Sequence, residues 1–171
     1  MKKWLAVMVW VVVAGTWPAA AVTVGEPAPD FRAVSTAGAE VGLADFAGSW
    51  LVLYFYPKSF TPGCTSEACS LRDGFAAIQG LGARILGVSV DGAETQRKFK
   101  AEHNLPFDLL ADRDGAVARA YGALRMGGFM ARRVTFLIAP DGRVAQVIED
   151  VKTGDHDAQV AEALRALQAK P

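Results

Sequence analysis

Two short, largely apolar segments constrain the fold of this chain more than any other feature of its sequence. The first, residues 50–56 (WLVLYFY), lies between Gly48 and Pro57, and the second covers residues 83–90 (ARILGVSV). Short runs that are rich in β-branched and aromatic residues are typical of strands buried on both faces of a sheet. Residues 64–79 between them carry apolar side chains at helical spacing. The sequence therefore predicts a strand–helix–strand unit with parallel strands.

Strand and helix patterns continue to alternate along the rest of the chain. The expected elements are a hairpin of residues 31–34 and 39–43 around Gly38, helices over 94–103, 114–121 and 155–167, and strands over 107–110, 133–139 and 143–148. The pair Asp141-Gly142 predicts a tight hairpin between the last two strands. This order predicts an α/β protein whose mixed central sheet has helices on both faces. A thioredoxin-like fold fits the order, as do other mixed α/β folds.

The N-terminal segment, residues 1–21, differs from the rest of the chain. Two lysines precede a continuous apolar run from Trp4 to Ala14, and a run of alanines follows. This layout is typical of a secretory signal peptide. The alternative is an uncleaved membrane anchor formed by residues 4–22, because that stretch approaches the roughly 18 apolar residues that a span needs. Either way we expect residues 22–171 to form a single domain outside the cytoplasm, in the periplasm.

The charge balance excludes several kinds of partner. The chain has 18 basic and 18 acidic residues, so its formal net charge is 0. Without a basic surplus, the sequence predicts no binding to nucleic acid and no electrostatic attraction to a membrane surface. Contact with a membrane is expected only if the N-terminal segment stays attached.

Cys64 and Cys69 are the only cysteines and the main candidates for chemistry. A cysteine pair in an exported domain often forms a structural disulfide. Cys64, however, follows Pro62-Gly63 and opens a predicted helix. Unpaired backbone N–H groups and the positive end of the helix dipole favour a thiolate there, and the thiolate is the nucleophilic form of cysteine. The position of Cys64 therefore predicts a reactive residue.

A hydroxyl and a cation are available to assist such a cysteine. Thr61 lies three residues before Cys64, and Arg133 starts a predicted strand as Arg-Val-Thr-Phe. Side chains alternate along a strand, so Arg133 and Thr135 are expected on one face of the sheet and Val134 on the other.

The segment around Cys64 resembles the peroxiredoxins. Residues 57–64 match the signature P-x-x-x-T-x-x-C in full. The longer string YFYPKSFTPGCTSEACSLRD resembles the Q-type, or bacterioferritin-comigratory-protein, branch of that family, which carries its second cysteine five positions after the first. Further matches are GVSVDGAETQRKFKAEHNLPFDLLADRDG, AYG and RVTFLIAPDGRV. The resemblance covers roughly residues 25–168 and implies a thioredoxin-like fold with an N-terminal β-hairpin.

The resemblance also implies a function. The chain would be a thiol-dependent peroxidase for hydrogen peroxide and organic hydroperoxides, with no cofactor and no metal. Cys64 would become a sulfenic acid, Cys69 would form a disulfide with it, and a thioredoxin-type dithiol protein would reduce the disulfide. Thr61 would hydrogen-bond the thiolate and the peroxide, and Arg133 would stabilise the thiolate and polarise the peroxide. The substrate pocket would include Pro57, Pro62, Gly63 and Glu67. A monomer is expected, with a dimer as the alternative.

The five-residue spacing of the cysteines restricts how they can pair. In a regular α-helix, Cα atoms five residues apart are separated by about 8.6 Å, which exceeds the roughly 7 Å limit for a disulfide. We therefore expect an intact helix in the reduced protein and unwinding of its first turns on oxidation. Phe60 stands where many relatives have a polar residue, which predicts an entrance that favours apolar hydroperoxides.

Three other functions are compatible with parts of the sequence. An exported thiol–disulfide reductase of the same fold would need Cys-x-x-Cys, which the sequence lacks. A metallochaperone would bind copper through the cysteines and a histidine, but no tight metal-ligand spacing links His103 or His156 to them. A binding module would use the cysteines as a structural bridge. Within the site, the structural alternatives are Thr61 as a helix N-cap, Arg133 as a surface residue with Arg132 as the competing cation, and Glu67 as a residue placed to suit the helix dipole.

Overall fold

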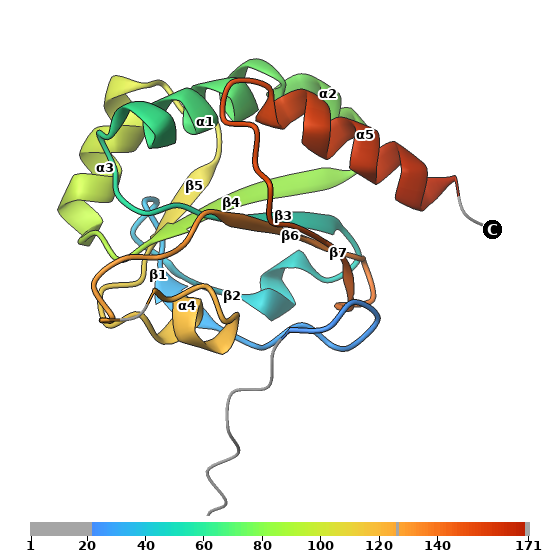
Figure 1. The fold of residues 1–171 in the computed structure, drawn as a ribbon, viewed down its shortest axis with the longest axis horizontal. Coiled ribbons are helices and arrows are strands. Elements are labelled where there is room, and N and C mark those ends of the chain that lie inside the picture. The colour runs from blue at the N-terminus through green and yellow to red at the C-terminus, as the bar shows by residue number, and fades with distance from the viewer. Residues whose placement is uncertain (1–21, 126, 170–171) are drawn as a thin grey trace, which may run out of the picture.

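The computed structural model describes residues 22–125 and 127–169 and consists of a five-stranded sheet, a small hairpin and surrounding helices (Figure 1). The strands are β1 (Arg32–Val34), β2 (Glu40–Gly42), β3 (Trp50–Phe55), β4 (Ala83–Ser89), β5 (Asp108–Ala111), β6 (Val134–Ile138) and β7 (Val144–Ile148). The helices are the 3-10 helix η1 (Leu43–Phe46), α1 (Pro62–Asp73), α2 (Phe75–Gly80), α3 (Ala93–Glu102), α4 (Ala116–Ala120) and α5 (His156–Gln168). The expected signal peptide or anchor lies outside the described residues.

The main sheet is mixed, as the sequence predicted. Its strand order is β5-β4-β3-β6-β7, with β3 in the centre. β3 and β5 both run parallel to β4, whereas β6 runs antiparallel to β3 and β7 antiparallel to β6. The crossovers through helices give the parallel pairs, and the turn at Asp141-Gly142 gives the last hairpin. Together with the β1–β2 hairpin, this confirms the predicted thioredoxin-like fold.

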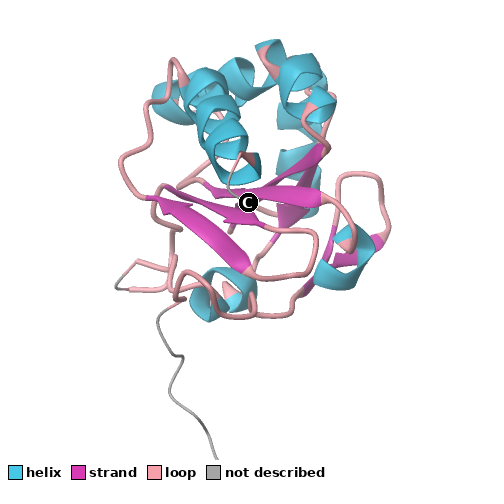
Figure 2. Cartoon of the chain, turned by 90° about the vertical axis from the view of Figure 1, so that its right-hand side faces the viewer, coloured by secondary structure: helices cyan, strands magenta, loops and turns pink. Residues whose placement is uncertain are grey.

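Helices cover both faces of the sheet, but unequally. Four helices (α1, α2, α3 and α5) lie on one face, and α4, η1 and the β1–β2 hairpin lie on the other (Figures 1 and 2). Successive side chains of β3 enter the two cores alternately: Val52 and Tyr54 pack under the four helices, and Leu51, Leu53 and Phe55 face the other side. Because both faces are buried, the strand sequence is continuously apolar rather than alternating.

The helix expected over residues 64–79 is interrupted. α1 ends at Asp73 and α2 begins at Phe75, with Gly74 between them. A Cβ atom at Gly74 would lie 2.3 Å from Cβ of Asp157, so only glycine lets the start of α5 approach so closely. The Asp157 carboxylate accepts a hydrogen bond of 2.7 Å from the Ser70 hydroxyl and fastens α5 to α1. No helix in the described part of the chain is long and apolar enough to cross a bilayer.

Candidate active site

The loop between β3 and α1 is held by buried polar groups at the carboxyl ends of two parallel strands. The Ser59 backbone N–H donates a 2.7 Å hydrogen bond to the Asp91 carboxylate, which follows β4. The Tyr56 hydroxyl donates to the side-chain oxygen of Gln96, and Gln96 in turn donates to the Ser89 hydroxyl at 2.8 Å. Loops at this edge of an α/β sheet commonly carry functional residues. The network therefore fixes the loop that leads to Cys64.

Cys64 lies in the first turn of α1. Thr61 is the N-cap residue, Pro62 is the first helical residue, and the first backbone hydrogen bond of the helix runs from Thr65 N–H to the Thr61 carbonyl at 2.9 Å. Cys64 precedes that bond, so it lies among N–H groups without intrahelical acceptors. Its side chain is almost fully buried, with the residue only 1% exposed. The sequence placed Cys64 at the start of the helix, and the structure puts it in the third helical position.

The guanidinium group of Arg133 lies against the Cys64 sulfur. Its Nη2 donates a hydrogen bond to Sγ over 3.3 Å, and its Nη1 donates to the Glu67 carboxylate. Arg133 directly precedes β6, whose residue Val134 pairs with Phe55 at the end of β3, so the strand pairing brings Arg133 to the same edge as the loop. A Cβ atom on Gly63 would lie 3.3 Å from Nη2, and glycine thus leaves room for the guanidinium group. Val134 packs on the opposite face, as predicted.

Arg133 remains cationic in this setting. Burial lowers the pKa of its guanidinium group, but the Glu67 carboxylate and the Cys64 sulfur raise it by more, and the pKa lies above its ordinary value. The neighbouring Arg132 instead pairs with Glu149 at 3.0 Å and donates to the Gly122 carbonyl. The structure therefore assigns the cation beside Cys64 to Arg133 and not to Arg132.

Glu67 is buried behind the cysteine, one turn further along α1. Its side chain is fully buried, and its second carboxylate oxygen, Oε1, lies 3.2 Å from Nδ1 of His156 at the start of α5. The other ring nitrogen of His156, Nε2, lies 3.1 Å from the Thr135 hydroxyl in β6. Sequence reasoning gave Glu67 a structural or pocket-lining role and gave His156 no part in the site. The one signal for this cluster was the predicted shared face of Arg133 and Thr135.

The remaining predicted site residues surround this cluster. The Thr61 hydroxyl donates to the Lys58 carbonyl at 3.0 Å and makes no capping bond to the helix. Cys64 and Cys69 are both free thiols in α1, and Cys64 is buried whereas Cys69 is partly buried. The helix is therefore intact in the reduced protein. Pro62 is exposed, and Pro57 is half-buried. The ring of Phe60 packs against Phe99 of α3, with 5.2 Å between the ring centroids.

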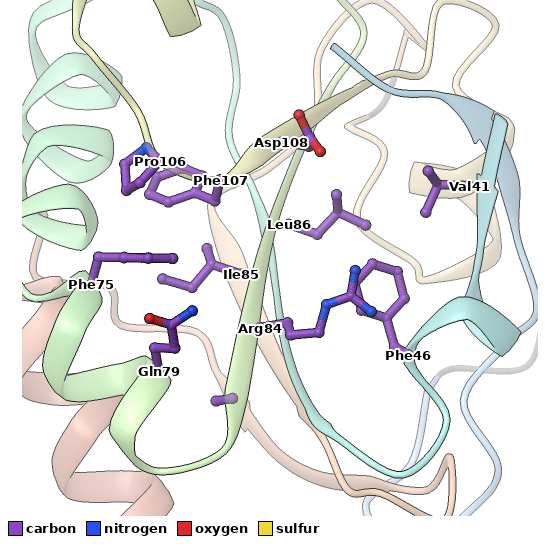
Figure 3. A pocket seen from close by; sticks show the side chains of 11 residues that line it. Val41, Phe46, Phe75, Gln79, Arg84, Ile85, Leu86, Pro106, Phe107 and Asp108 are labelled. Carbon is purple, nitrogen blue, oxygen red and sulfur yellow. The ribbon is translucent and has the colours of Figure 1, made fainter. Parts of the chain in front are cut away.

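A separate cavity of about 190 Å³ lies at the opposite end of the sheet (Figure 3). The cavity lies beside the first residues of β4, which begins at Ala83, three residues before its pairing with β5 starts at Leu86. The lining residues are Val41, Phe46, Phe75, Gln79, Ala83, Arg84, Ile85, Leu86, Pro106, Phe107 and Asp108. None of them belongs to the site around Cys64. Among the residues that the structure describes, no three His, Cys, Asp or Glu side chains are grouped to hold a metal ion.

Comparisons with known proteins agree with this geometry. The AhpC/TSA family model matches residues 24–147. Peroxiredoxin Bcp of Bacillus subtilis is 39% identical over 155 residues, which cover 87% of this chain and 99% of that protein. Peroxiredoxin Bcp of Escherichia coli K12 is 38% identical over 138 residues, 77% of this chain and 88% of that protein.

Solved structures give the same result. The bacterioferritin comigratory protein of Xanthomonas campestris, whose structures were solved to study its alkyl peroxide reduction activity, has a TM-score of 0.76 and 36% sequence identity to this chain. The match covers 82% of this chain and 92% of that protein. Peroxidoxin BcpB of Mycobacterium tuberculosis has a TM-score of 0.78 and 32% identity, with 85% and 97% covered.

Proposed function

Because this chain belongs to the AhpC/TSA family and is a peroxiredoxin, we propose that it is a peroxidase in which Cys64 attacks the hydroperoxide and Cys69 completes a disulfide. One observation supports this assignment above the others. The only cation within hydrogen-bonding distance of the Cys64 sulfur in the described residues is Arg133, and it approaches that sulfur at the start of a helix.

The first step is the attack of the Cys64 thiolate on one oxygen of the hydroperoxide. An S–O bond forms, the O–O bond breaks, and the sulfur is oxidised to a sulfenic acid. The other oxygen leaves with the electron pair and takes up a proton to give water or an alcohol. Arg133 stabilises the charge that grows on the oxygens, because its guanidinium group is already oriented by Glu67. The Thr61 hydroxyl donates to Lys58 and keeps two lone pairs, which can accept the peroxide O–H.

The second step joins the two cysteines. The Cys69 thiol attacks the sulfenic sulfur, an S–S bond forms, and the oxygen leaves as water. Both cysteines lie in α1, at a helical Cα separation of about 8.6 Å that a disulfide cannot span. The second half of α1 is fastened by Ser70 to Asp157 and by Arg72 to the His103 carbonyl at 3.0 Å. We therefore assign the unwinding to residues 62–69.

The third step returns the protein to its reduced form. An external dithiol protein of the thioredoxin type would attack the disulfide and leave as the oxidised partner. We propose that this occurs in the periplasm, with the domain either released by cleavage after residue 21 or anchored through residues 4–22. We further propose that the enzyme works as a monomer.

Two variants test the assignment of the cysteines. Cys64→Ser should abolish peroxide consumption with dithiothreitol as reductant, because the nucleophile is missing. In the absence of dithiothreitol or any other added thiol, Cys69→Ser should still react with peroxide once per molecule and stop at the sulfenic acid of Cys64. Circular dichroism of both reduced variants controls for folding. Peroxidase turnover by Cys64→Ser at the parental rate would contradict the assignment.

A further inference from the structure

We propose that His156 is a positioning residue for the peroxidase reaction: it holds the Glu67 carboxylate, which in turn holds the Arg133 guanidinium group against the Cys64 sulfur. This inference rests on the proposed function and extends it to a residue on a different element of the fold. Thr135 in β6 contacts His156 in α5, and His156 contacts Glu67 in α1. Glu67 then binds Arg133, which precedes β6 and contacts the Cys64 sulfur.

The carboxylate of Glu67 has two buried oxygens with two different partners. Oε2 accepts from Arg133, and Oε1 faces His156 Nδ1 at 3.2 Å. The side chains of Glu67 and His156 are both fully inaccessible to solvent. Their two facing atoms lie at ion-pair distance without the geometry of a hydrogen bond, and neither has any other hydrogen-bond partner among the described residues. Since a buried polar atom without a partner is costly, each of these two atoms depends on the other.

The opposite side of the imidazole ring is fixed as well. Nε2 lies 3.1 Å from the Thr135 hydroxyl, which can donate to it or accept from it. In the neutral ring, donation by Thr135 to Nε2 leaves the proton on Nδ1, the ring nitrogen that lies 3.2 Å from the Glu67 carboxylate. The ring of Tyr54 in β3 stands edge-on to the imidazole, with 6.4 Å between the ring centroids. His156 is therefore held by residues of two strands, with its Nδ1 at ion-pair distance from the carboxylate.

Without His156, one oxygen of Glu67 would have no partner, and the carboxylate could turn about its side-chain bonds. The guanidinium group would turn with it, because Nη1 is bound to that carboxylate. Nη2 would then lose its alignment with Sγ and with the oxygens of a bound peroxide. A misplacement of about 1 Å can cost a hundredfold in rate. His156 never touches the substrate and acts only through this alignment.

Two amide variants separate positioning from packing. An Asn side chain places its amide near the position of Nδ1, toward Glu67, whereas a Gln side chain places its amide near Nε2, toward Thr135. Both are neutral and polar, so they serve as matched controls for each other. In a Cys69→Ser background, Cys64 is the only thiol, and its loss on adding hydrogen peroxide gives the rate.

We expect His156→Asn to retain the parental rate within about threefold, and His156→Gln to lose about tenfold or more. Alkylation of Cys64 by iodoacetamide, which has no O–O bond to align, should change less than about threefold in both variants when it is measured at a pH high enough to ionise the thiol in each of them. Because Cys64 is 1% exposed, a variant that merely loosens the fold would be alkylated faster instead.

Equal peroxide rates for the Asn and Gln variants, or faster alkylation that accompanies the loss in the Gln variant, would overturn the positioning role. A parental Cys69→Ser protein that does not react with peroxide at all would instead overturn the proposed function.

Discussion

Replacing Arg133 by methionine should reduce both the stability and the peroxidase activity of this protein, and a second substitution should restore only the stability. Arg133→Met removes the cation from a fully buried carboxylate, that of Glu67, while the Arg133 side chain itself is 23% exposed. Breaking a buried ion pair by removing one partner costs about 3–5 kcal/mol, because a charge is left buried without compensation. The partial exposure of the arginine places the expected loss near the lower limit, about 3 kcal/mol.

The double variant Glu67→Gln/Arg133→Met removes the unpaired charge as well. Its free energy of unfolding should return to within about 1 kcal/mol of the parent, since a buried ion pair contributes little net stability over neutral residues. Peroxidase activity should fall by about 10²–10³ in both variants, the effect of losing one donor to a developing oxyanion. Urea unfolding of the reduced proteins measures the first quantity, and peroxide consumption with dithiothreitol measures the second.

Arg132→Met is the matched control, because Arg132 pairs with the exposed Glu149 at 3.0 Å. An exposed pair contributes about 1 kcal/mol or less, so this variant should keep the parental stability and activity. Unfolding of Arg133→Met at the parental urea concentration, or recovery of activity along with stability in the double variant, would contradict these roles of Arg133 and Glu67.

Three further predictions concern the packing, the pH response and the oxidised state. Gly74→Ala should lower the free energy of unfolding by about 1–3 kcal/mol, because the added Cβ would lie 2.3 Å from Cβ of Asp157. Gly80→Ala is the control and should not destabilise the protein, because no atom lies within 4 Å of its added Cβ. Equal urea midpoints for the two variants would be inconsistent with this prediction. Burial raises the pKa of Asp108, but hydrogen bonds from Lys100 and Thr36 outweigh it and keep the pKa below its ordinary value. The ionised Asp108 side chain thus stabilises the fold above a pH of about 4, and this effect is lost as the pH falls through the lower pKa of the folded state. Asp108→Asn should therefore make the urea midpoint less dependent on pH in that range. An unaltered pH dependence would count against this prediction. On oxidation, the backbone amides of residues 65–73, whose helical acceptors are the carbonyls of residues 61–69, should exchange faster with solvent. The amides of Gly74 and Ile78, which donate to the Ser70 and Gly74 carbonyls, should stay protected, and unchanged exchange at 65–73 would rule out the unwinding of α1.

The elements that sequence could predict are those whose signals are local. The largely apolar segments identified β3 and β4, and Pro62-Gly63 marked the start of α1. The alternation in Arg-Val-Thr-Phe predicted that Val134 and Arg133 lie on opposite faces, whereas the place of Arg133 beside Cys64 was implied only by the resemblance to peroxiredoxins. Each of these inferences depends on a few neighbouring residues and on the periodicity of a strand or helix.

The features that sequence missed depend on contacts between distant parts of the chain. The break at Gly74 exists because Asp157 fills the space of a Cβ atom, and the accompanying bond joins Ser70 to a residue 87 positions away. His156 likewise reaches Glu67 only after α5 has docked beside α1. A lone histidine at the start of a surface helix carries no local sign of such burial.

The most direct test of the account is the mass of the reduced protein after one equivalent of hydrogen peroxide. The parent should lose two hydrogen atoms, with the new disulfide mapped to Cys64 and Cys69, and Cys69→Ser should gain one oxygen atom on Cys64. An unchanged mass in both proteins, or oxygen found on Cys69 of Cys64→Ser at the parental rate, would contradict it.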